Sequence, residues 1–158
     1  MTLQVRRIVT GHDANGRAVV KIDEVAKNVA SGRPGQSAFV GWTTEGFPVD
    51  NSRDEDTSER DVGTTLASGT VFRIVEFGPG VTPRVHRTDS IDFAVVMSGE
   101  LDMELDDSVV HLRAGDVLVQ RGTIHNWVNK GSEPCVIAFV LIDAKPVVAG
   151  GKVLNAQG

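Results

Sequence analysis

Short runs of alternating apolar and polar residues fill the second half of the chain. Residues 70–77, TVFRIVEF, alternate in this way and are rich in β-branched and aromatic residues, which is typical of a strand. Turn signals such as GPGVTP separate such runs about every eight to twelve residues, a spacing that predicts a sandwich or barrel. The further expected strands are a pair within 93–105 joined at Ser98-Gly99, then 109–112, 117–120, 125–129 and 135–143.

The N-terminal part is less regular. Residues 3–11 and 17–22 have the pattern of two strands, and the turn residues 13–16 between them predict a hairpin. Residues 23–30 are compatible with one or two helical turns that begin at Asp23 as N-cap. A further strand is expected over 37–44.

A polar segment separates this part from the strand-rich half. Residues 45–66 are acidic with few apolar anchors, so they form either a solvated loop or a lid over a pocket. We therefore divide the chain into an extension over 1–65, a barrel core over 66–145 and a tail over 146–158. The extension is expected to pack on the barrel.

Composition narrows the class of protein. The chain has 158 residues, 41% of them hydrophobic and 23% charged, which suits one soluble globular domain. A formal net charge of −5 argues against nucleic acid or an anionic membrane as partner, because both require a positive face. The single cysteine, Cys135, cannot form an internal disulfide, and no apolar run resembles a signal peptide or a membrane span. A cytoplasmic protein is the expectation.

Three polar residues are candidates for a functional site inside the barrel. Side chains two apart on a strand share a face, so His86, Asp92 and His125 can point into one barrel interior from three segments. A small closed barrel has room for one small ligand or a metal ion.

At these positions the sequence resembles the cupin family of jelly-roll β-barrels. The first cupin motif runs G-x5-H-x-H-x3–4-E-x6-G. The stretch from Gly80 to Gly99 keeps every spacing, with His86 at the first histidine, Thr88 at the second and Asp92 at the glutamate.

The second cupin motif, G-x5-P-x-G-x2-H-x3-N, is also recognisable. It begins at Gly115 and continues through Gly122, His125 and Asn129, with one residue fewer before the second glycine and Arg121 in place of the proline. The resemblance covers roughly residues 66–143 and implies an all-β jelly-roll barrel carrying an N-terminal β-hairpin extension.

The departures bear on the metal that cupins often hold. The resemblance implies ligands at His86, Thr88, Asp92 and His125, but a neutral threonine hydroxyl binds a divalent metal weakly. His86, Asp92 and His125 would still make a complete set of two histidines and one carboxylate for iron, manganese, zinc or nickel. Without metal, the same three residues would line a polar pocket and perform acid–base chemistry on a bound substrate.

Other residues are candidates for the pocket wall. Arginine at 84 or 121 suits a substrate carboxylate, although either side chain can equally remain in water. The remaining candidates are Thr88, Trp42, Trp127 and Asn129, and a tryptophan in a barrel is often simply core.

Two functions remain open. The first is a small-molecule enzyme of the decarboxylase, isomerase or dioxygenase type, acting on an oxygenated organic acid or an enolisable carbonyl compound. The second is a non-catalytic module that binds a small ligand and has lost its metal site. Because jelly-roll edges need covering and cupins are often dimers, we also expect a homodimer, with residues 3–11 and the tail beyond 145 as candidate contacts.

Overall fold

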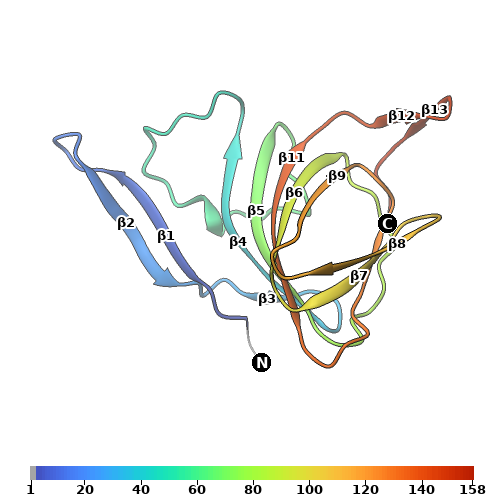
Figure 1. Cartoon of the computed structure of the whole chain (residues 1–158). Helices are drawn as coiled ribbons and strands as arrows, with labels where there is room; N and C mark the ends of the chain where they lie inside the picture. Colours follow the sequence, from blue (N-terminus) through green and yellow to red (C-terminus); the bar gives the residue numbers. More distant parts are fainter. Residues whose placement is uncertain (1–2) are drawn as a thin grey trace.

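The structure is a computed structural model that describes residues 3–158, and almost all of its regular structure is β-strand (Figure 1). Two sheets enclose the barrel, a six-stranded one in the order β3-β4-β5-β11-β6-β9 and a three-stranded one in the order β10-β7-β8. The predicted all-β jelly-roll is confirmed. The barrel strands are β3 (Ala30–Ser31), β4 (Gln36–Glu45), β5 (Gly69–Phe77), β6 (Ser90–Ser98), β7 (Glu100–Glu104), β8 (Val109–Arg113), β9 (Val117–Arg121), β10 (Asn126–Val128) and β11 (Cys135–Asp143).

The six-stranded sheet is organised around β11, which pairs antiparallel with β5 on one side and β6 on the other. Its apolar residues alternate between the two faces. Ile137, Phe139 and Leu141 point inward and are at most 5% exposed. The apolar pattern that predicted this strand therefore supplies one wall of the core.

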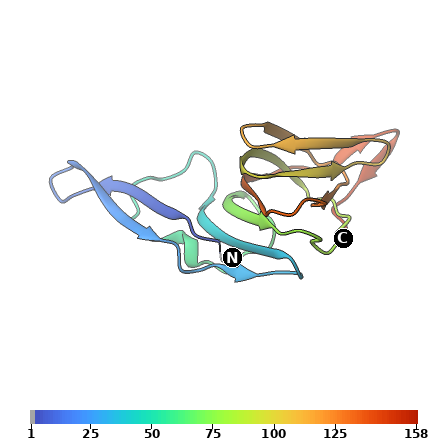
Figure 2. The ribbon, with the colours of Figure 1, turned by 60° about the horizontal axis from the view of Figure 1, so that its bottom comes forward.

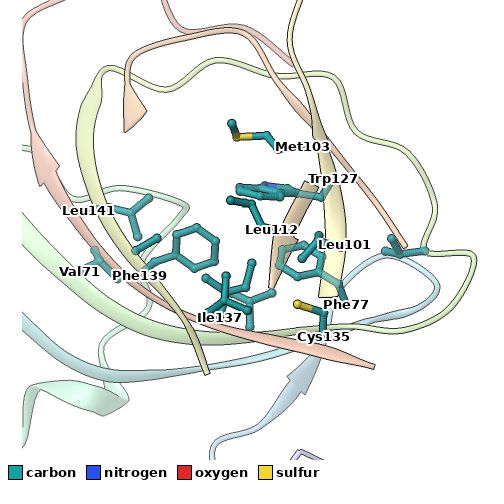
Figure 3. Close-up of a cluster of buried hydrophobic side chains, with 14 residues drawn as sticks. Val71, Phe77, Leu101, Met103, Leu112, Trp127, Cys135, Ile137, Phe139 and Leu141 are labelled. Carbon is teal, nitrogen blue, oxygen red and sulfur yellow. The ribbon is translucent and has the colours of Figure 1, made fainter. Parts of the chain in front are cut away.

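The three-stranded sheet supplies the opposite wall of the core (Figure 3). Trp127 of β10 packs with its ring centroid 5.6 Å from that of Phe77 and 5.8 Å from that of Phe139. Each aromatic pair of this kind contributes roughly 0.5–1.5 kcal/mol beyond the area it buries. These contacts join the two sheets.

Gly99 allows the tight connection between β6 and β7. Its φ is +74°, in the left-handed region that favours glycine, and a Cβ there would collide with the carbonyl oxygen of Pro134. The last glycine of the first motif is therefore required by the backbone.

The N-terminal hairpin extends outward from the barrel (Figures 1 and 2), while at its base Leu3 and Ala26 pack against Phe39 and Ile74 of the six-stranded sheet. It consists of β1 (Arg6–His12) and β2 (Ala18–Val25), as the turn at residues 13–16 predicts. The predicted helical turns at 23–30 are wrong, because β2 continues through Val25. The Asp23 carboxylate accepts two hydrogen bonds of 2.7 Å from Arg6 across the hairpin, so it stabilises the strand pair instead of capping a helix.

The polar segment over 45–66 is held against β4 and the hairpin. It contains the short 3₁₀ helix η1 (Thr57–Glu59), whose Thr57 hydroxyl donates to the Thr43 carbonyl oxygen and accepts from the Thr43 N–H. The buried Arg7 guanidinium binds the Asp56 carboxylate at 2.7 and 2.9 Å.

Within residues 3–158, no helix is long and apolar enough to cross a membrane.

The tail is paired within the chain. Strands β12 (Val147–Ala149) and β13 (Lys152–Leu154) form a hairpin, and Gln157 forms an isolated antiparallel bridge with Arg87. The tail therefore returns to the segment that carries His86.

The outer face of the six-stranded sheet is apolar and exposed beside β6. One continuous cross-strand row runs over four strands, because Phe72 lies opposite Val140, Val140 opposite Phe93, and Phe93 opposite Val119. Phe72, Phe93 and Val119 are 41%, 47% and 57% exposed. A contiguous apolar patch of this kind marks an interaction surface more often than a solvated one.

We propose that a second copy of the chain covers this face. Light scattering on the purified protein should then give a mass near twice 16.9 kDa. Phe93→Glu should move the protein to the monomer, because it places a charge in the centre of the apolar row. Val153→Glu on β13, where the valine is 59% exposed, is the matched control and should leave the mass unchanged. A wild-type monomer at micromolar concentration would contradict the proposal.

Candidate functional site

A cavity of about 60 Å³ lies inside the barrel, between the two sheets. Its apolar wall includes Phe77, Trp127 and Phe139, which belong to the core described above. Its polar wall brings together residues from five segments of the chain: Arg33, Gln36, Thr64, Arg73, Arg84, His86, Thr88, Asp92, Gln120 and His125. The cavity is small, so it accommodates a small molecule or the reacting end of a larger one.

His86 and His125 meet in this cavity, as their positions in the sequence predict. The two residues form an isolated antiparallel bridge, in which each N–H donates to the carbonyl oxygen of the other at 3.0 Å. Their ring centroids are 4.2 Å apart, and the residues are only 7% and 3% exposed. The backbone bridge therefore places two buried imidazoles side by side.

Hydrogen bonds to the backbone orient both rings. The Nδ1 atom of His86 lies 2.9 Å from the Arg84 carbonyl oxygen, and the Nδ1 atom of His125 lies 2.9 Å from the Thr123 carbonyl oxygen. Since a carbonyl oxygen only accepts, each Nδ1 carries the proton and donates. In the neutral rings, each Nε2 is left as the basic nitrogen.

Burial keeps both imidazoles neutral at physiological pH. It lowers the pKa of His125 to about 4, and the charges of His86 and Arg84 act in the same direction. Burial also lowers the pKa of His86, with smaller contributions from the charges of Arg84 and Arg33. The backbone hydrogen bonds at Nδ1 oppose these shifts without cancelling them.

Asp92 lies in the same cavity, within a chain of hydrogen bonds. Its Oδ1 accepts from the Ser90 hydroxyl at 2.6 Å, and that hydroxyl lies 2.8 Å from the Thr88 hydroxyl. Its Oδ2 accepts from the Gln120 amide at 3.3 Å. Burial raises the pKa of the Asp92 carboxyl, while the hydrogen bonds from Ser90 and Gln120 lower it.

Gln120 connects the carboxylate to the imidazole, and the sequence reasoning missed it. Its Nε2 lies 3.0 Å from Nδ1 and 3.1 Å from Nε2 of His125, while its Oε1 is buried without a partner among residues 3–158. That oxygen is an acceptor that a substrate hydroxyl can satisfy. Gln120 lies directly opposite Asp92 in the pairing of β9 with β6. Only that register, which the sequence does not give, identifies it as a pocket residue.

The predicted metal set does not fit this arrangement. Among residues 3–158, no three histidine, cysteine, aspartate or glutamate side chains are placed to hold a metal ion. Both oxygens of Asp92 accept hydrogen bonds, and an amide N–H of Gln120 points at His125, where it cannot act as a ligand. We therefore derive no step through a metal, and metal binding by His86, Asp92 and His125 stays a prediction.

The weaker pocket candidates separate into two groups. Thr88, Arg84 and Trp127 line the cavity, whereas Arg121 is exposed at the end of β9. Trp42 faces a different groove, between the N-terminal hairpin and the 45–60 segment.

Asn129 is buried and does not line the cavity. Its Nδ2 donates to the carbonyl oxygens of Phe77 and Glu133, and its Oδ1 accepts from the Gly131 N–H. The asparagine of the second motif therefore fixes the turn before β11.

Two cationic residues of the cavity, Arg33 and Arg73, were also missed. Arg73 had a readable signal, since it shares the inward face of β5 with Val71, Val75 and Phe77 in the pattern that predicts this strand. Arg33 precedes β4 in an irregular segment, where alternation gives no direction.

Comparisons with known proteins identify the family of the chain. The family model described as "Cupin domain" matches residues 73–142. The chain is 37% identical to phomopsin biosynthesis cluster protein C' of Diaporthe leptostromiformis, over 94% of this chain and 84% of that protein. It is 32% identical to the cupin-domain-containing oxidoreductase fogC of Aspergillus ruber, over 94% of this chain and 77% of that protein.

A solved structure is a more distant match. An RmlC-like cupin from Shewanella frigidimarina is 14% identical, with a TM-score of 0.49 over 73% of this chain and 83% of that chain. The close relatives, the family model and the barrel with its two motifs lead to one conclusion: this chain belongs to the cupin family.

Proposed function

We propose that the chain is an enzyme that moves a proton on a small enolisable carbonyl compound of the oxygenated organic acid type. The observation that carries the proposal is the His86–His125 pair, in which two neutral rings present basic Nε2 atoms to one cavity. Relatives that are named oxidoreductases, such as fogC, support an enzyme over a binding module.

The chemistry begins with proton abstraction. The Nε2 atom of one histidine takes the proton from the carbon next to the substrate carbonyl, and the electron pair moves onto the carbonyl oxygen as an enolate. Positive side chains at the cavity, Arg84 among them, stabilise that negative charge. Return of the proton at another carbon completes an isomerisation, and loss of carbon dioxide from a 3-oxo acid reaches the same enolate.

Asp92 and Gln120 position the pair. The amide of Gln120 donates toward His125 Nε2, and Asp92 holds that amide in place from its other side. We assign proton transfer chiefly to His86, because no donor within residues 3–158 occupies its Nε2. When the substrate binds, it replaces the Gln120 amide as the partner of His125.

The alternative is a cupin that binds a small ligand without catalysis. The observation in its favour is that Thr88, Ser90 and Asp92 are satisfied by one another, so the site requires no metal to be stable. Measuring proton exchange and binding on the same protein separates the two functions.

Proton exchange tests the enzyme directly. In D₂O, the protein should accelerate exchange of the α-protons of 2-oxobutyrate or acetoacetate, followed by proton NMR. His86→Ala should lower the rate about a hundredfold or more, since general bases contribute on that order. His111→Ala is the control, because His111 is exposed and paired with Asp102 and Glu100. Binding without exchange across a series of 2-oxo and 3-oxo acids would establish the alternative.

Metal content is a separate prediction. If His86, Asp92 and His125 rearrange into a metal site, protein purified without chelators should contain near-stoichiometric iron, manganese, zinc or nickel. That metal should vanish in both His86→Ala and Asp92→Ala. Metal-free protein that still exchanges α-protons would refute the metal site and leave the proton-transfer proposal standing.

The neutral histidines predict how stability depends on pH. In the unfolded chain a histidine titrates near 6.5, whereas folding lowers the pKa of His125 to about 4. Its stabilising contribution is complete above about pH 6.5 and is lost as the pH falls toward 4, because the unfolded chain then binds more protons. Asp92, whose pKa is raised, acts in the opposite direction, since its contribution is lost as the pH rises through its folded pKa.

Urea unfolding at pH 7 and pH 5 measures this effect. The loss attributable to His125 is on the order of 2 kcal/mol between these values. His125→Gln should flatten the difference, whereas His111→Gln should not. Equal pH dependence in wild type and His125→Gln would show that the buried imidazole is not the titrating group.

A further inference from the structure

Three arginines line the barrel cavity, and within residues 3–158 none of them pairs with an aspartate or glutamate side chain. Arg33 precedes β4, Arg73 lies in the middle of β5, and Arg84 precedes His86, so the charges come from separate segments. Arg6, Arg7 and others do form such pairs. The chain has more acidic than basic residues, 21 against 16, so a shortage of carboxylates is not the reason.

Neutral oxygens orient Arg33 and Arg73 without neutralising them. Arg33 donates to the Thr82 carbonyl oxygen and to Gln36 Oε1, and Arg73 donates to the Gly63 carbonyl oxygen at 2.6 Å. Arg84 donates through Nε and Nη2, at 3.2 and 2.9 Å, to the main-chain oxygen of Gly158, the last residue of the sequence, which is a carboxylate oxygen where a chain ends. The contacts of Arg33 and Arg73 fix the direction of both side chains and leave their positive charges in the cavity.

Two donors in this group have no acceptor. Arg33 Nη2 and Arg73 Nε are buried and make no hydrogen bond within residues 3–158. An unsatisfied buried donor destabilises the folded state, and more so when it is charged. Burial lowers the pKa of Arg33 and of Arg73, and the nearby charge of Arg84 lowers both further. Donors of this kind are open to a hydrogen bond from a ligand or from an ordered water.

The one carboxylate at the cavity does not balance the three charges. Asp92 accepts from Ser90 and Gln120 and makes no contact with an arginine. With Asp92 ionised, the charges of Arg33 and Arg73 alone exceed the one negative charge of that side chain, so the cavity keeps a positive excess.

We propose that Arg33, Arg73 and Arg84 bind a carboxylate of the substrate beside the His86–His125 pair. The inference rests on the proposed function for the role of the histidines, and it adds that the substrate must be an acid. Guanidinium groups match a carboxylate in geometry and bind it through charge-assisted hydrogen bonds. Arg33 Nη2 and Arg73 Nε supply free donors, and Arg84 lies two residues before His86, whose Nδ1 donates to the Arg84 carbonyl oxygen.

The cavity volume limits the size of that group. A space of about 60 Å³ holds only a few atoms, so a carboxylate and its neighbouring carbonyl fill it. Arg33 and Arg84 are partly exposed, so the cavity reaches the surface on their side and the rest of a larger acid can extend there.

The test compares an acid with its neutral ester. Isothermal titration with 2-oxobutyrate and with its methyl ester should show the acid binding at least tenfold more tightly, because only the acid accepts charge-assisted hydrogen bonds from the guanidinium groups. Arg73→Gln and Arg84→Gln should each abolish most of that difference. Arg121→Gln, at an exposed arginine outside the cavity, is the matched control and should preserve it.

Thermal unfolding checks that the variants fold. Removing one of three repelling cations should not lower the melting temperature, and Arg84→Gln, at a partly exposed position, provides a second variant should Arg73→Gln fail to fold. Equal binding of acid and ester by the wild type would overturn the proposal, as would Arg73 and Arg84 variants that retain the preference. A competition titration then compares inorganic phosphate with another carboxylic acid. If phosphate displaces 2-oxobutyrate at the lower concentration, the assignment of the arginine site to a carboxylate is overturned.

The outcome is independent of catalysis. Selective acid binding without α-proton exchange would retain the arginine site and refute the proposed enzyme. Equal α-proton exchange on the acid and on the ester would retain the proposed enzyme and refute the arginine site.

Discussion

The reciprocal backbone hydrogen bonds between His86 and His125 determine the geometry of the site. No regular strand lies between the end of β5 at Phe77 and the start of β6 at Ser90, so this bridge fixes the register of the intervening segment. Residues 84, 86 and 88 then share one face, and all three line the cavity. A slip of one residue would turn all three away from the cavity, because the side-chain period along a strand is two.

Burial and the nearby arginines both favour the neutral form of the two histidines. Removing an imidazole from water disfavours its charged form, and the guanidinium groups nearby disfavour it again. Burial therefore keeps the Nε2 atoms unprotonated, and the charges of Arg84 and Arg33 add to this effect while the cavity is free of anions. A carboxylate bound among them would offset part of their charge and make the imidazoles more basic when substrate is present. The apolar wall of Phe77, Trp127 and Phe139 strengthens both effects, because it keeps the local dielectric low.

Strand periodicity predicted the fold well, because each strand buries one face. The spans expected at 70–77 and 135–143 agree with β5 and β11 within a residue. The helical interpretation of 23–30 failed because β2 pairs with β1 along the hairpin through Val25, and this pairing overrides a weak local preference.

Only part of the site could be predicted from the sequence. Motif spacing brought His86, Asp92 and His125 to one cavity, but the relations among them depend on register. Gln120 enters through its pairing with Asp92, and Arg33 enters from an irregular segment where alternation gives no direction. Arg73 could have been predicted as a pocket residue, because it is a charged side chain at an inward position of a strand. A scan for charges that break the apolar face would have found it.

The two departures from the first cupin motif form a consistent pair. Thr88, Ser90 and Asp92 alternate along the chain and so share a face, and their side chains form one continuous hydrogen-bond chain. A histidine at 88 would carry no hydroxyl for Ser90, and a glutamate at 92 would push its carboxylate about one carbon–carbon bond, roughly 1.5 Å, farther into a cavity already occupied by the Gln120 amide. Each change therefore makes the other tolerable. The first motif keeps its spacing because the backbone bridge and the Gly99 turn need it, while its side chains have become a hydrogen-bonded support for the histidine pair.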